Sequence, residues 1–256
     1  EIKFNYFLKY GLSLGFDKVA TGHYAKLKKE KNFITLSIPK DRQKDQTYFL
    51  YILNQKIMKK ILFPLANITK EEVKAYAKSL DIQIYNKKES MGICFIGKRN
   101  FSNFIKDYIY NSPGVVMDSF GNVLGKHSGL FNYTIGQRKG IRIGGRKDSL
   151  DKPWFVIKKD VKKNILLISQ NEKDLLYKGD INLDSVNWVS SAKTKIKCSI
   201  RFRHGGKLIP GEVSKRNNNY ILKLEKRERA ITPGQSAVFY KNNKCLGGGI
   251  VTKLDP

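Results

Sequence analysis

Apolar residues in the first hundred positions recur at helical spacing in two stretches. The opening stretch EIKFNYFLKYGLSLGF predicts a helix whose apolar side is formed by Phe4, Phe7, Leu8 and Leu12. The clearest helix is expected in ITKEEVKAYAKSL, where Thr69 is a candidate N-cap and Glu72, three positions on, completes a capping box. The apolar side of this second helix is formed by Val73, Tyr76, Ala77 and Leu80.

Extended stretches separate these helices. We expect a short strand ending in a Gly-His loop in DKVATGHYAKL, a charged hairpin in AKLKKEKNFITLSI, and a brief extended piece in IQIYNK. A further helix is expected to start in KDQTYFLYIL. The alternation of helix and strand up to about residue 98 predicts the back half of an α/β domain.

Beyond residue 98 the pattern becomes β-rich. One more helix is expected in NFSNFIKDYIYN, and two strands around a Lys-Lys-Asn turn are expected in WFVIKKDVKKNILLIS. From about residue 173, short strands are split by Asn and Gly turns, as in KCSIRFR, GEVSKR, NYILKLE, QSAVFY and CLGGGIV. The predicted fold class is α/β plus β: the remainder of an α/β domain (1–98), a small β-rich central domain (99–172) and a C-terminal antiparallel β-barrel (173–256).

Composition narrows the class of protein. The chain of 256 residues is 41% hydrophobic but has no apolar run near the ~20 residues of a membrane helix, and no signal peptide is visible. Three cysteines do not make a disulfide framework, so we expect a soluble, cytoplasmic protein. The net charge of +27 favours a polyanionic partner, nucleic acid first, although a bias toward Lys, Asn and Ile could raise the charge without a function.

One cysteine has a setting that suits reactivity. Cys94 lies in SMGICFIGKRN, between two glycines and just before Lys98 and Arg99, and a helix is expected to follow. Positive charge and a helix N-terminus both favour the thiolate. The alternative is a small buried side chain between Ile93 and Phe95. Cys198 and Cys245 lie in predicted strands and are expected to be structural, and the three cysteines have no zinc-binding spacing.

Three further segments are candidate sites. Gly22 and His23 follow a predicted strand, where ligands bind in open α/β sheets, although an ordinary turn would look the same. Lys44, Asp45 and Gln46 stand at a helix start, where Asp45 could simply be an N-cap. The segment TIGQRKGIRIGGRK crowds cations among glycines, as a phosphate-binding loop or a solvated charge run would: Arg138, Lys139, Arg142, Arg146 and Lys147.

Seven motifs follow one another along the chain: ATGHYA, KDQTYFLY, GICFIG, GKHSGLFNYTIGQRKGI, PWFVIKKD, ITPGQSAVFY and CLGGGI. In this order they closely resemble those of the tRNA-specific 2-thiouridylases, the MnmA/TrmU family, from residue 1 to about 251. The resemblance implies that 1–98 is the C-terminal part of an ATP-pyrophosphatase catalytic domain. It also implies that 99–172 is a central tRNA-binding domain and 173–256 a β-barrel domain.

The resemblance implies replacement of the C2 oxygen of the tRNA wobble uridine by sulfur. ATP, with Mg²⁺, activates the carbonyl as an adenylate, and a persulfide on Cys94 delivers sulfur received from a cysteine desulfurase or a sulfur-relay protein. It also implies a disulfide bond and an ATP contact at Gly22. The implied tRNA contacts are His23, Lys44, Asp45, Gln46, Arg201, Phe202 and Gln235, with Phe202 where the family has Tyr.

The chain departs from the family at its start. Members begin with an SGGVDS-like loop that grips ATP phosphates and carry a second catalytic cysteine shortly before EIKF, whereas this sequence starts at EIKF. We therefore expect a truncated chain that binds tRNA weakly and ATP poorly. The competing hypothesis is a non-catalytic RNA-binding module with a barrel, in which Cys94 is structural.

Overall fold

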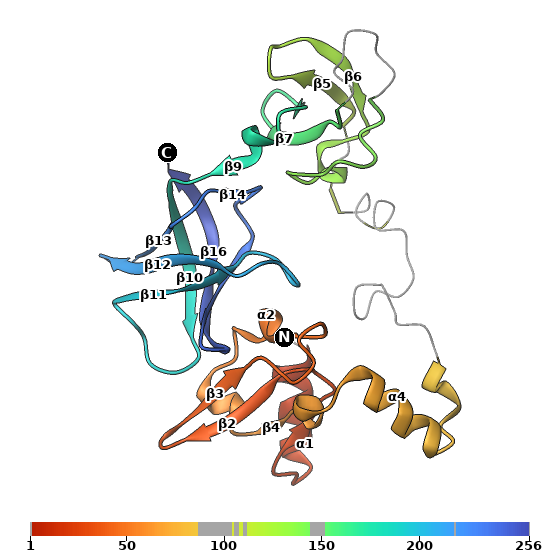
Figure 1. Cartoon of the computed structure of the whole chain (residues 1–256), viewed down its shortest axis with the longest axis vertical. Helices are drawn as coiled ribbons and strands as arrows, with labels where there is room; N and C mark the ends of the chain where they lie inside the picture. The colour runs from red at the N-terminus through yellow and green to blue at the C-terminus, as the bar shows by residue number, and fades with distance from the viewer. Residues whose placement is uncertain are drawn as a thin grey trace. The chain divides into compact units, whose positions relative to one another are not determined.

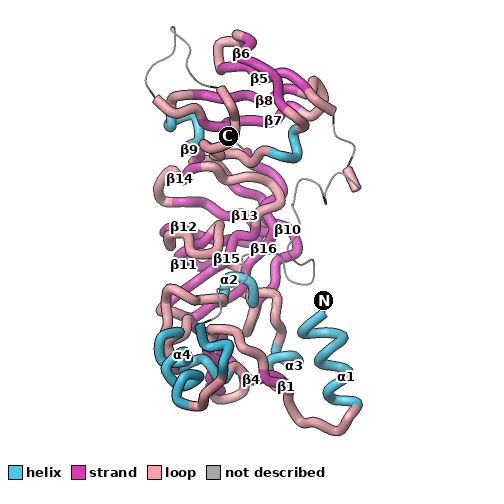
Figure 2. The backbone as a smooth tube through the Cα atoms, turned by 90° about the vertical axis from the view of Figure 1, so that its right-hand side faces the viewer, coloured by secondary structure: helices cyan, strands magenta, loops and turns pink. Residues whose placement is uncertain are grey.

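The computed structural model describes residues 2–86, 104, 108–109, 112–143, 152–217 and 219–255 (Figures 1 and 2). Contacts divide the chain into two units. The outer unit comprises Glu1–Lys87, Lys178–Lys226 and Thr232–Pro256, and the middle unit comprises Lys88–Tyr177 and Arg227–Ile231. The middle unit is thus an insertion between the two halves of the outer unit. No helix among the described residues is both long and apolar enough to cross a membrane.

The N-terminal part of the outer unit is an α/β part with a two-stranded parallel sheet, in which β1 pairs with β4. The strand before the Gly-His loop and the charged hairpin are both confirmed. The elements are a π-helical turn Ile2–Phe7, α1 (Leu8–Ser13), β1 (Val19–Ala20), β2 (Lys26–Glu30), β3 (Phe33–Ser37), α2 (Thr47–Leu50), α3 (Gln55–Met58), β4 (Ile61–Leu62), a 3-10 turn Pro64–Asn67, α4 (Lys70–Ser79) and a 3-10 turn Gln83–Asn86.

Helix α4 begins at the predicted capping box. The Thr69 hydroxyl accepts from the Glu72 N–H, and the Glu72 carboxylate accepts from the Thr69 N–H. The expected apolar side of this helix is not buried by the described residues, since Tyr76 is 63% and Leu80 70% exposed. The prediction of an extended piece in IQIYNK is wrong, because Gln83–Asn86 forms a 3-10 turn directly after the helix.

The C-terminal part of the outer unit is the expected antiparallel β-barrel. Its strands follow one another in the order β10-β13-β12-β11-β15-β16, and β16 closes the barrel by pairing with β10. Their bounds are β10 (Asp180–Trp188), β11 (Lys195–Arg201), β12 (Ile209–Arg216), β13 (Asn219–Leu224), β15 (Ser236–Lys241) and β16 (Lys244–Asp255). Gly247, at φ +148°, lets β16 pass close to β10, where a Cβ would overlap the carbonyl oxygen of Asn187.

The α/β part and the barrel share one sheet and one hydrophobic core. Strand β3 pairs with β16 through Ser37 opposite Lys244 and Leu36 opposite Cys245. Residues of both parts bury their side chains in a single cluster, which includes Leu36, Leu50, Met58, Val238, Tyr240 and Cys245. The two parts are therefore one folding body, although ninety residues separate them in sequence.

The middle unit contains a four-stranded sheet of order β6-β5-β8-β7, in which only the β5–β8 pairing is parallel. Its elements are β5 (Gly114–Asp118), β6 (Val123–His127), a 3-10 turn Leu130–Asn132, β7 (Phe155–Asp160), β8 (Ile165–Ser169), a 3-10 turn Glu172–Leu175, and β9 (Leu176–Tyr177) paired with β14 (Glu228–Arg229). The two strands expected around the Lys-Lys-Asn turn are β7 and β8, which confirms that prediction. Most of NFSNFIKDYIYN lies outside the described residues.

Candidate functional site

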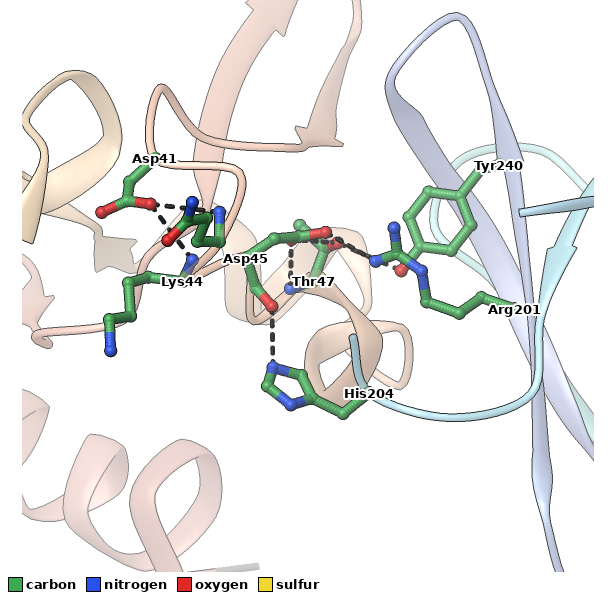
Figure 3. Close-up of polar contacts among 8 residues, drawn as sticks. Asp41, Lys44, Asp45, Thr47, Arg201, His204 and Tyr240 are labelled. Atoms are coloured by element: carbon green, nitrogen blue, oxygen red, sulfur yellow. Dashed lines mark hydrogen bonds and ion pairs between the residues drawn. The ribbon is translucent and has the colours of Figure 1, made fainter. Parts of the chain in front are cut away.

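Asp45 and Arg201, two of the candidate residues, form a buried ion pair (Figure 3). The Arg201 Nη1 lies 2.7 Å from the Asp45 Oδ2, and the side chains are only 12% and 4% exposed. The Asp45 Oδ1 also accepts from the N–H and the hydroxyl of Thr47, at 2.9 and 2.6 Å. Arg201 lies in addition over the ring of Tyr240, 4.9 Å from its centroid. Both charges are thus held by neighbours within the protein.

Asp45 is not the N-cap of α2, which is the next residue along the chain. Gln46 is the N-cap of α2 and makes no side-chain capping bond, while Asp45 reaches Thr47, the first residue of the helix. The Gln46 side chain turns the other way. Its Oε1 accepts from the Tyr24 N–H at 2.9 Å, which ties the helix start to the loop of Gly22 and His23.

Tyr48 of α2 joins three candidate segments that are far apart in sequence. Its hydroxyl donates to the carbonyl oxygens of Phe202 at 2.8 Å and Ser236 at 3.1 Å. Gln235 precedes Ser236, and its side-chain oxygen accepts from the Thr232 N–H at 3.1 Å. The structure therefore brings the Lys-Asp-Gln segment, the Arg-Phe pair and Gln235 to one place.

The candidate residues differ in how far their side chains reach solvent. Phe202 is buried at 6% exposure, so its backbone carbonyl makes the contact with Tyr48. Lys44 and Gln235 are half-buried. The Lys44 side chain extends away from the Asp45–Arg201 pair (Figure 3), while its N–H donates to the Asp41 carboxylate at 3.2 Å.

Gly22 and His23 line a small cavity of about 290 Å³ together with Lys3, Phe7, Thr21 and Gln46. A Cβ on Gly22 would meet nothing nearer than the Leu65 Cδ1 at 4.0 Å, so this glycine leaves open space rather than a tight contact. The cavity is at the lower end of small-ligand sites in volume. Lys3 is among its lining residues and brings positive charge to the cavity.

His23 is held neutral inside this cavity. Its ring contacts those of Phe4 and Phe63, with centroid distances of 5.4 and 5.8 Å, and its Nδ1 is 2.9 Å from the Thr21 hydroxyl. Burial, and to a smaller extent the charge of Lys3, lowers the pKa of His23 to about 4. At neutral pH His23 therefore offers hydrogen bonds without a charge.

The cysteines divide as expected where the structure describes them. Cys198 in β11 and Cys245 in β16 are buried and free, and burial raises the pKa of each thiol to about 12. Both are structural, as predicted, and neither takes part in a disulfide. Cys94 lies outside the described residues. Among the residues that the structure covers, no group of three His, Cys, Asp or Glu side chains could hold a metal ion.

The basic loop belongs to the middle unit. Arg138, Lys139 and Arg142 are exposed, while Arg146 and Lys147 lie outside the described residues. The loop is shaped by Gln137, whose side chain accepts from the Thr134 N–H at 2.9 Å and donates to the Lys139 carbonyl at 2.8 Å. The exposed cations are accessible to a polyanion.

Sequence reasoning missed Tyr48, Thr47 and Tyr240, which hold the candidate residues in place. Tyr48 and Thr47 lie inside the motif KDQTYFLY, but their spacing looks like that of ordinary helical residues. Tyr240 is buried in a strand, and nothing in its local sequence indicates a contact with Thr47, whose hydroxyl lies 3.1 Å from its own.

Three family descriptions match successive parts of the chain. They are "tRNA methyl transferase HUP domain" for residues 1–98, "tRNA methyl transferase PRC-barrel domain" for 102–170 and "Aminomethyltransferase beta-barrel domain" for 178–251. The α/β part, the middle sheet and the six-stranded barrel correspond to them in order.

Several curated proteins are similar along the whole chain. The tRNA-specific 2-thiouridylase MnmA of Pseudomonas entomophila is 40% identical over 261 residues, which are 100% of this chain and 69% of that protein. MnmA 1 of Geobacillus kaustophilus is 44% identical over 99% of this chain and 69% of its own length. MnmA of Buchnera aphidicola is 42% identical over 100% of this chain and 71% of its own length.

Proposed function

Because this chain belongs to the family of tRNA-specific 2-thiouridylases, we propose that it is a tRNA-uridine 2-sulfurtransferase. The reaction is the ATP-dependent 2-thiolation of the wobble uridine of tRNA in the cytoplasm. The observation that carries the proposal is the convergence of three candidate tRNA-binding segments on Tyr48, through its bonds to Phe202 and Ser236 and the adjoining Asp45–Arg201 pair.

Cys94 is the sulfur carrier in this proposal. Its support is the motif GICFIG followed by Lys98 and Arg99, since nearby cations favour the thiolate that accepts sulfur. The buried thiols of Cys198 and Cys245 do not suit this role, because their pKa values of about 12 keep them protonated at neutral pH. A cysteine desulfurase or a sulfur-relay protein is the proposed donor.

ATP is the proposed co-substrate, together with Mg²⁺, and supplies the leaving group for the C2 oxygen. Gly22 would contact it at the cavity beside Lys3, where the missing Cβ leaves room and the ammonium offers positive charge. His23 at the same cavity would contact tRNA as a neutral imidazole.

The remaining candidates are proposed to bind tRNA in two ways. Lys44, Gln46 and Gln235 are partly exposed and can face the nucleic acid directly. Asp45, Arg201 and Phe202 are mostly buried, so their main contribution is to fix the shape of the surface that tRNA meets. The net charge of +27 supplies the long-range attraction.

The test replaces Cys94 with serine in the full-length protein. We expect Cys94→Ser to abolish 2-thiouridine formation while tRNA affinity stays nearly unchanged, because a thiol is too small to anchor much RNA. Thiolation is measured by nucleoside mass spectrometry and affinity by filter binding. Cys198→Ala is the matched control, and it should keep its thiolation activity.

A normal thiouridine yield in Cys94→Ser would refute the assignment. Mass spectrometry of the protein after incubation with a cysteine desulfurase and cysteine gives an independent readout. Added sulfur on Cys94 supports the sulfurtransferase, whereas no added sulfur together with intact tRNA binding supports a non-catalytic RNA-binding module in which Cys94 is structural.

A further inference from the structure

An exposed aromatic pair stands beside the candidate tRNA-binding residues. Phe49 of α2 is 55% exposed, and its ring stacks on His204 with centroids 4.8 Å apart and planes 28° apart. The ring of Tyr48 meets Phe49 edge-on, with centroids 5.4 Å apart and planes at 83°. One face of a large apolar ring is thus supported by protein while much of the ring remains in solvent.

Hydrogen bonds fix the two rings that contact Phe49, those of His204 and Tyr48. The His204 Nε2 lies 2.9 Å from the backbone carbonyl oxygen of Asp45 (Figure 3). Because a carbonyl oxygen only accepts, this nitrogen carries the proton and donates. The Tyr48 hydroxyl is bonded to the carbonyls of Phe202 and Ser236. Without these contacts the exposed Phe49 side chain would sample several rotamers. Because they restrict it before binding, less side-chain entropy is lost when a ligand stacks on the ring.

Positive charge borders the aromatic pair. Arg203 precedes His204 and is exposed. Burial raises the pKa of Tyr48, and the charge of Arg203 opposes this rise, which indicates that its guanidinium is near the Tyr48 hydroxyl. A turn in which the Gly206 N–H donates to the Arg203 carbonyl at 2.9 Å leads on to the exposed Lys207. An aromatic face beside cations is the arrangement by which proteins bind single-stranded nucleic acid.

We propose that Phe49, backed by His204, is a stacking platform for an unpaired nucleobase of the bound RNA, with Arg203 and Lys207 facing the adjoining phosphates. This rests on the proposed function, in that the chain binds tRNA, and adds a site to it. Every base has a flat face, so the platform selects for an unpaired base rather than for one sequence.

The test compares Phe49→Leu with Phe49→Trp in the full-length protein. Leucine keeps an apolar side chain but removes the ring, whereas tryptophan keeps a stacking face. We expect Phe49→Leu to weaken binding of an unmodified tRNA transcript by about five- to 150-fold, the effect expected when a base-stacking aromatic side chain is removed. Phe49→Trp should bind like the wild type. Phe33→Leu is the matched control, since Phe33 is 38% exposed on the β2–β3 hairpin of the same unit.

Two further measurements separate stacking from charge and from general damage. The slope of log affinity against log salt should be the same in Phe49→Leu and the wild type, because the ring carries no charge, whereas loss of a cation lowers the slope. Binding to a fully paired RNA duplex should not change. Circular dichroism confirms that each variant is folded.

The outcomes distinguish this site from the proposed function. If the wild type binds tRNA and Phe49→Leu binds equally well, the platform is refuted and the proposed function stands. If Phe49→Leu weakens duplex and tRNA binding alike, stacking on an unpaired base is likewise refuted. If the wild type binds no tRNA, the proposed function itself fails and the platform fails with it.

Discussion

The Asp45–Arg201 ion pair is almost completely removed from solvent, which sets how it responds to mutation. Removing one partner of a buried pair leaves the other charge without compensation, at a cost of about 3–5 kcal/mol. We expect Asp45→Ala to lower the free energy of unfolding by this amount, measured by urea denaturation at pH 7. Binding of tRNA should weaken as well, because Arg201 and the start of α2 lose their common anchor.

The control for this prediction is an exposed ion pair of the same barrel. Lys195 lies 3.1 Å from Glu212, and its side chain is 68% exposed. Exposed pairs contribute about 0–1 kcal/mol, so Lys195→Ala should change stability little. Equal losses in the two variants would contradict a special role for the buried pair.

His23 gives the protein a predictable response to acid. Its pKa is about 4 in the folded protein, against an ordinary value of 6.5 for a solvated histidine, so between these values the unfolded chain binds more protons than the folded one. Stability from this residue is therefore complete above pH 6.5 and is lost as the pH falls toward 4. We expect the urea midpoint to fall between pH 7 and pH 5, and to fall less in His23→Gln.

This pH window isolates His23 from the carboxylates with lowered pKa values. Glu72, Asp118 and Asp255 have pKa values below their usual range, so they lose their stabilising effect only at more acidic pH. An unchanged fall between pH 7 and pH 5 in His23→Gln would mean that other groups control acid sensitivity.

At the scale of elements, the basic loop of the middle unit is a candidate phosphate-binding surface. Replacing Arg138 and Lys139 with alanine should weaken tRNA binding and reduce the log–log salt slope by roughly 1–2 units, about 0.9 for each phosphate that is no longer neutralised. The double variant Lys162→Ala/Lys163→Ala removes the same charge from the exposed β7–β8 turn of this unit and should reduce the slope less. If the log–log salt slope were the same in both double variants, the basic loop would be no more than a solvated charged surface.

The sequence predicted those helices and strands that are determined by residues close to one another in the chain. The capping box of Thr69 and Glu72 involves residues three positions apart, and the β2–β3 and β7–β8 hairpins follow from short turns between alternating strands. The stretch IQIYNK was predicted wrongly, because its apolar residues alternate as in a strand while the chain is still completing the turn after α4.

The arrangement of the site could not be predicted in the same way. Its deciding contacts join Asp45 to Arg201, Thr47 to Tyr240 and Tyr48 to Ser236, each across more than 150 residues. Such pairs leave no periodic signal in one sequence. The motifs identified Asp45 and Arg201 as candidate site residues, but only the fold shows that they form an ion pair.

At the scale of the whole molecule, the middle unit interrupts a body that the two ends of the chain build together. Leu36 from the first end and Tyr240 and Cys245 from the second share one hydrophobic cluster. The tRNA-binding candidates of the outer unit come from both ends in the same way. Their arrangement therefore depends on the completed outer unit.

The pairing of β3 with β16 also has a consequence during synthesis on the ribosome. Strand β3 leaves the ribosome about 200 residues before its partner, which at 5–20 residues per second is a delay of roughly 10–40 s. For that time one edge of the β2–β3 hairpin has no partner, and an open strand edge can pair with another chain. Lys28, Lys29 and Lys31 on and beside this hairpin place like charges on every nascent copy. We expect the repulsion between these charges to disfavour pairing between nascent chains before β16 is synthesised.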